Sequence, residues 1–154
     1  MNAREYLEAI VRPNINDFSG DYANLRLGLN AVHTLDALAA HIFNEAGGEA
    51  VLGCADDSAY RGVLAAANGD FGLLRDVAKA VKHVELNRGK PQLSGAKQVS
   101  VQTLGYGQAR YGEGRYGSPS QLVVRTDGGD TRVLETIVMS SLAFLEGEMA
   151  HHDL

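Results

Sequence analysis

Asp36 and His33 form the first pair of side chains whose types and spacing could do chemistry. They lie three residues apart in a helical pattern, about 60° apart around the helix axis. Asp36 falls where the pattern calls for an apolar residue, and a carboxylate buried alone costs several kcal/mol. One interpretation is a buried polar pair that acts as an acid–base pair or as two metal ligands. The other, which the lack of an accompanying metal-binding motif favours, is that Leu35 fills the core and Asp36 bonds to a neighbouring helix at its edge.

A second set of candidates, Arg75, Lys79 and His83, lies on the polar face of one helix. A lysine one turn before a histidine could lower the imidazole pKa and hold a phosphate. A metal-independent ribonuclease needs this combination for its general base and its anionic intermediate. A solvated helix face, with Asp76 and Lys79 as a surface ion pair, is the alternative interpretation.

The long helix and the basic segment from Arg75 to His83 resemble the HEPN-like superfamily of prokaryotic helical-bundle proteins. The resemblance covers residues 17–88 and rests on the architecture and on one basic helix with a histidine. The superfamily includes RNases of toxin and antiphage systems together with non-catalytic members. The resemblance implies His83 as the base and Lys79 or Arg75 as the phosphate-binding residue. The spacing from Arg75 to His83 is longer than in the catalytic pattern of the family.

A Tyr-Gly-x-x-Arg unit repeats with a period of five inside residues 105–120. Its glycines favour a long mobile loop, and loops of this length are usually functional or disordered. Interleaved tyrosines and arginines suit a protein partner or single-stranded nucleic acid, and the net charge of −5 favours the protein. The alternative is that the tyrosines fold back on the sheet. The partner-binding candidates are Tyr106, Arg110, Tyr111, Arg115 and Tyr116.

Hydrophobic periodicity predicts the elements that must position these residues. We predict helices over 2–11, 17–46, 58–67, 70–87 and 134–149, and strands over 98–104, 121–126 and 131–133. Strands confined to one block favour a mainly α, α+β fold, a helical bundle with a small antiparallel hairpin or three-stranded meander before the last helix. The helix over 17–46 is the expected centre. The predicted core is Leu25, Leu29, Val32, Leu35, Phe43, Leu74, Val81, Leu134, Val138 and Leu145.

Length and composition limit the class of protein. The 154 residues, of which 45% are hydrophobic and 21% charged, suit one globular domain over 1–154. The single cysteine, Cys54, cannot form a disulfide within the chain, which fits a reducing compartment. The first residues carry charges and no apolar run approaches the roughly 20 residues of a membrane span, so we expect a cytoplasmic protein without membrane contact.

No nucleophile elbow, phosphate-binding loop or zinc pattern is present in the sequence, and we predict neither a cofactor nor a metal. Long amphipathic helices suit self-association. The leading hypothesis is therefore a non-catalytic interaction or structural protein of a prokaryote that forms a homo-oligomer such as a homodimer. A second protein could bind through loop 105–120, whereas the net charge disfavours nucleic acid. The alternative is a HEPN-like metal-independent RNase or RNA-binding protein of a toxin or antiphage system.

Overall fold

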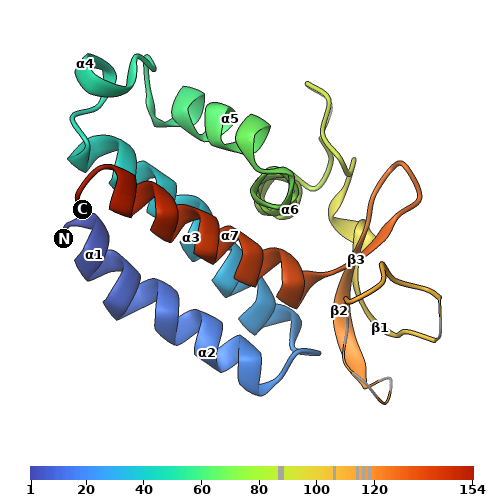
Figure 1. Ribbon diagram of the computed structural model, residues 1–154. Helices are drawn as coiled ribbons and strands as arrows, with labels where there is room; N and C mark the ends of the chain where they lie inside the picture. Colours follow the sequence, from blue (N-terminus) through green and yellow to red (C-terminus); the bar gives the residue numbers. More distant parts are fainter. Residues whose placement is uncertain (87–88, 106, 114, 116, 118) are drawn as a thin grey trace.

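The computed structural model describes residues 1–86, 89–105, 107–113, 115, 117 and 119–154. It confirms the mainly helical α+β fold, a bundle of helices with a small antiparallel sheet at one end (Figure 1). The elements are α1 (Ala3–Tyr6), a π-helical turn (Leu7–Val11), α2 (Arg12–Gly20), α3 (Leu25–Glu45), α4 (Glu49–Leu52), α5 (Asp57–Ala67), α6 (Gly69–His83), a 3-10 turn (Ala96–Gln98), β1 (Val99–Thr103), β2 (Ser120–Arg125), β3 (Thr131–Val133) and α7 (Leu134–His151). In the part of the chain that is described, no helix could cross a membrane.

The N-terminal helical rod differs from the prediction. Pro13 does not end it, and α1, the π-helical turn and α2 continue to Gly20. The π-helical turn ends at Val11, two residues before the proline, whose ring would otherwise meet the carbonyl of Ala9 in a regular helix. The predicted helix over 17–46 is therefore wrong at its start, because residues 17–20 belong to α2. Its end is as predicted, since Gly47 and Gly48 both adopt positive φ angles.

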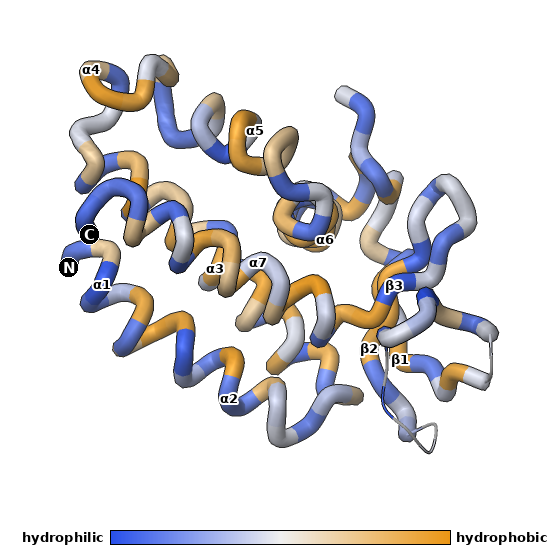
Figure 2. The backbone as a smooth tube through the Cα atoms, in the orientation of Figure 1, coloured by the Kyte–Doolittle hydropathy of each residue, from blue (hydrophilic) through white to orange (hydrophobic). Residues whose placement is uncertain are grey.

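α3 is the central helix and packs against α2, α5, α6 and α7. Figure 2 shows apolar and polar residues alternating along α1 and α2, so that one side of the rod is apolar. Most of the predicted core is buried, but Leu25 is exposed and Leu29 and Val81 are only partly buried. Leu25 is the first residue of α3, where the bundle no longer covers the helix.

β2 is the middle strand of the sheet, and the order is β1-β2-β3. Leu122 and Val124 on β2 belong to the main core, whereas Val123 belongs to a second, smaller core cluster that Ala109 of the loop helps to cover. The three strands match the prediction to within one residue at each end. α6 ends earlier than predicted, at residue 83, because Val84 takes a positive φ of 67°.

Candidate functional site

Asp36 pairs with an arginine of a neighbouring helix. Arg61 on α5 places Nη1 2.7 Å from Asp36 Oδ2 and Nη2 2.6 Å from Asp57 Oδ2. Leu35 is fully buried and Asp36 lies at the edge of the core, with its Oδ1 buried and without a hydrogen-bond partner. His33 is exposed and is not the buried polar residue that we predicted, because the buried side of α3 is centred on Leu35. Asp36 therefore joins two helices and does not pair with His33.

Two of the α6 candidates, Arg75 and Lys79, are affected by the charges of the same ion pair. Arg75 Nη2 donates a hydrogen bond to the Ser58 carbonyl at 2.8 Å. Burial lowers the pKa of Arg75, and burial together with the charge of Arg75 lowers the pKa of Lys79. Asp36 acts on the pKa of both cations in the opposite direction. Arg61 thus pairs with Asp36, whose charge also acts on Arg75 and Lys79, while His83 is exposed at the end of α6.

The loop between β1 and β2 carries a buried carboxylate that the sequence reasoning did not single out. Glu113 Oε1 lies 2.7 Å from Arg132 Nε on β3, and Glu113 Oε2 accepts a hydrogen bond from the Val133 amide at 3.0 Å. Arg132 Nη2 lies 2.8 Å from Asp70 Oδ1 on α6. The side chains of Arg132 and Glu113 are only 7% and 8% exposed.

Burial alone would lower the pKa of Arg132, but its hydrogen bonds with Asp70 and Glu113 outweigh that effect and raise the pKa. The arginine therefore stays charged, and the three side chains join the loop, the sheet and α6. Only one signal in the sequence could have pointed to this contact. Glu113 is the acidic residue of a segment whose other charged side chains are arginines.

The two loop arginines are also engaged. Arg115 lies 3.0 Å from Glu135 on α7, its guanidinium carbon lies 3.7 Å from the centre of the Tyr22 ring, and it donates a hydrogen bond to the Tyr22 hydroxyl. Arg110 lies 3.2 Å from Asp130. Both guanidinium groups therefore have a carboxylate partner within the chain.

Of the three loop tyrosines, the structure describes Tyr111. Tyr111 is fully exposed, so it does not fold back on the sheet. Tyr106 and Tyr116, the other two predicted partner-binding tyrosines, lie outside the described residues. The structure thus leaves one described aromatic ring of the repeat, that of Tyr111, free for contact with another molecule.

A shallow hollow lies beside the loop, with a volume of about 580 Å³ and open to solvent. Met139 of α7 contributes an apolar side chain that is 46% exposed. The remaining lining is polar and comes from the loop and from the first turns of α7: Gly112, Arg115, Glu135, Thr136 and Ser140.

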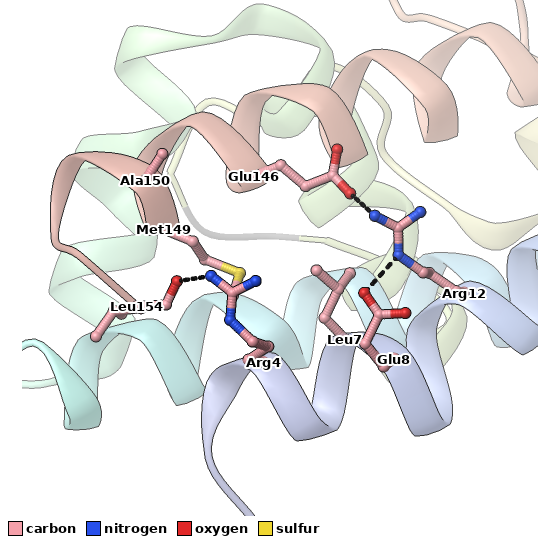
Figure 3. Close-up of a pocket in the computed structure, with 8 residues that line it drawn as sticks. All are labelled: Arg4, Leu7, Glu8, Arg12, Glu146, Met149, Ala150 and Leu154. Carbon is pink, nitrogen blue, oxygen red and sulfur yellow. Dashed lines mark hydrogen bonds and ion pairs between the residues drawn. The ribbon is translucent and has the colours of Figure 1, made fainter.

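A second hollow, of about 190 Å³, lies between the N-terminal rod and α7 (Figure 3). Arg12 spans it, with Nε 3.0 Å from Glu8 and Nη2 2.6 Å from Glu146. Arg4 donates a hydrogen bond to the Leu154 carbonyl. The charged side chains that line this hollow thus have partners within the chain, and Arg12 fastens the N-terminal rod to the last helix.

Comparison with protein-family models, with characterised proteins and with solved structures found no match for this chain. Within the described ranges, no group of three or more His, Cys, Asp or Glu side chains is placed to hold a metal ion. The function must therefore be inferred from the geometry of the chain itself.

Proposed function

We propose that this chain is a non-catalytic interaction protein that self-associates and that also binds a protein partner through its loop and the start of α7. Tyr111 carries the second part of the proposal. It is fully exposed, and Glu113 and Arg115, two and four residues further on, fix the loop to the sheet and to α7. A tyrosine on such an anchored segment offers contact area with little further loss of conformational entropy.

The charges of this surface indicate the chemistry of the partner. Arg110 and Arg115 are both paired with carboxylates, so the described part of the loop does not present a free guanidinium to a phosphate. Met139 supplies apolar surface in the hollow next to Gly112. A protein segment that offers an apolar side chain to Met139 and a flat surface to Tyr111 fits this arrangement.

The contacts of the catalytic candidates support the non-catalytic part. Asp36 forms an ion pair with Arg61, and Arg75 donates a hydrogen bond to the backbone of α5. His83 is exposed at the end of α6. General acid–base catalysis needs a base within hydrogen-bond reach of the group that it serves. The first two side chains instead stabilise the packing of three helices.

Two experiments test the proposal. The first is affinity capture from the native host with three proteins: the wild-type chain, Tyr111→Ala and Val51→Ala. Val51→Ala is the control, because it removes an exposed side chain on α4 (66% exposed) instead of one on the loop. We expect the same bound protein with the wild type and Val51→Ala, and its loss with Tyr111→Ala. Retention by Tyr111→Ala would contradict the role of the loop. Sedimentation equilibrium at micromolar concentration tests self-association, and a strict monomer would contradict it.

A second candidate function is a metal-independent RNase or RNA-binding protein of a toxin or antiphage system. One observation favours it: the charges of Arg61, Arg75 and Lys79 act on one another, and His83 follows Lys79 by one turn at the end of α6. The test is cleavage of labelled RNA in the presence of a chelator. We expect activity to be lost in Lys79→Ala and His83→Ala and kept in His33→Ala. The absence of both cleavage and RNA binding by the wild-type chain would remove this candidate.

A further inference from the structure

β1 is an outer strand of the sheet. One hydrogen bond on β2 shows in which direction the N–H and C=O groups of β1 point. The Leu122 amide donates to the Tyr22 carbonyl at 2.8 Å, so the N–H and C=O of Leu122 point away from β1. Val101 is the partner of Leu122 in the antiparallel register. In such a ladder the two residues of a pair either bond each other or both point away. The N–H and C=O of Val101 therefore point outward from the sheet.

The same alternation sends the backbone groups of Val99 and Thr103 outward. The Val99 N–H donates to Ala96 in the preceding 3-10 turn. Within the described part of the chain, five outward groups have no partner: the carbonyl of Val99, both groups of Val101 and both groups of Thr103. These groups form a row of two donors and three acceptors along one edge.

The side chains of β1 do not protect this edge. Natural outer strands carry a charge, a proline or a bulge that discourages pairing with another chain. Residues 99–103 read Val-Ser-Val-Gln-Thr and pair with β2 without a bulge. Val101 is 47% exposed. Nothing in the strand opposes the approach of a further strand.

We propose that two copies of this chain pair through β1, antiparallel, about a two-fold axis at Val101. Four of the five free groups of each copy then find a partner, and the Thr103 carbonyl stays open to solvent because the Val99 N–H is already bonded to Ala96. The N–H of Val101 donates to the Val101 carbonyl of the second copy, and the N–H of Thr103 donates to its Val99 carbonyl, in both directions. The two three-stranded sheets become one continuous sheet, and the interface is isologous.

The edge favours a second copy over an unrelated peptide because it is complementary to itself. Ser100 faces Gln102 of the second copy, and these two side chains already bond each other within one strand, at 3.0 Å. No charged side chains oppose each other along residues 99–103. The inference rests on the proposed self-association and locates its interface at the outer edge of β1.

The experiment is sedimentation equilibrium of the full chain with Val101→Lys, Val101→Glu and their mixture. A lysine at the two-fold axis faces a second lysine, so we expect the dimer of Val101→Lys, and likewise that of Val101→Glu, to be more than about tenfold weaker. The mixture should recover the dimer, because opposite charges then meet at the same position. Val51→Lys is the control on another exposed valine, and it should leave the wild-type dimer unchanged.

Each other outcome overturns the pairing through β1. Persistence of the dimer in Val101→Lys would mean that self-association uses another surface, and loss in Val51→Lys as well would mean a general effect of charge. A mixture that stays monomeric, or a monomeric wild type that binds an extended peptide at this edge, would also refute it. Only the monomeric wild type contradicts the proposed self-association, and the Tyr111 capture experiment is independent of all of them.

Discussion

β3 and β1 are the two outer strands of the same sheet, but the chain satisfies their outward backbone groups differently. On β3 the Val133 amide donates to Glu113 from the loop. On β1 the outward groups of Val101 have no partner in the described part of the chain. At the first edge a charged side chain binds the outward Val133 amide, and the second edge carries no charged side chain. The loop therefore begins at the end of β1, which we call the open edge, and its Glu113 binds the outward amide of β3, which we call the closed edge.

The closure of the β3 edge depends on a buried charge network. Arg132 and Glu113 leave water almost completely, and Asp70 balances the second side of the guanidinium. Such networks add little net stability, because desolvation offsets the attraction, but they are strongly destabilising when one member is removed. The stability of the closed edge therefore depends on each single member of this network, whereas the open edge depends on no such network.

The largest expected effect comes from Arg132→Met, which leaves Glu113 and Asp70 without their buried cation. We expect the free energy of unfolding to fall by about 3–5 kcal/mol, measured by urea denaturation. Arg110→Met is the matched control, because its pair with Asp130 is more than half exposed, and it should cost at most about 1 kcal/mol. Equal effects of the two variants would show that burial of the network does not matter.

Glu113→Ala should have the next largest effect on the free energy of unfolding. It should also leave the outward Val133 amide of β3 without a partner, like the outward groups of β1. It removes a hydrogen bond to the Val133 amide and one to Arg132, so we expect a loss of about 1.5–3 kcal/mol. Hydrogen exchange at the Val133 amide should accelerate. Glu113→Gln keeps an oxygen that can accept from this amide, so its exchange should stay slow. Slow exchange in Glu113→Ala would show that something other than Glu113 closes the β3 edge.

Local patterns made most of the elements predictable. Gly47 and Gly48 end α3, Asp56 caps α5, and alternating β-branched residues mark the strands. One exception is Pro13, where the local rule predicts a helix end and the π-helical turn removes the clash between the proline ring and the preceding turn. Helix and strand positions follow from neighbours in sequence, and a local rule fails where an irregular turn intervenes.

The site was less predictable, because its contacts link residues far apart in the chain. Arg61 meets Asp36 across the gap between two helices, and Glu113 meets Arg132 across the sheet. No periodic pattern specifies such partners. The lack of charge in 99–103 is visible in the sequence, but it acquires a meaning only when the sheet order places β1 at the edge.

On the open edge, a charge should cost a single chain little. Val101→Lys places its ammonium group at a half-exposed position, so we expect the free energy of unfolding to change by less than about 0.5 kcal/mol. The measurement is urea denaturation at a concentration at which the wild type has dissociated. A loss as large as that in Arg132→Met would mean that Val101 belongs to the core and not to an edge.

The smallest effect on stability is expected at Tyr111, two residues before the side chain that closes β3. Glu113 points into the fold and Tyr111 out of it, so the loop presents an inner and an outer side within three positions. Tyr111→Ala should leave the free energy of unfolding within about 0.5 kcal/mol of the wild type, because a fully exposed ring loses no burial. The Val133 amide should remain protected and the sedimentation behaviour unchanged, since neither Glu113 nor β1 is altered. Faster exchange at Val133 in this variant would show that the exposed ring helps to hold the closed edge, and the loop could then no longer be divided into a structural side and a partner-binding side.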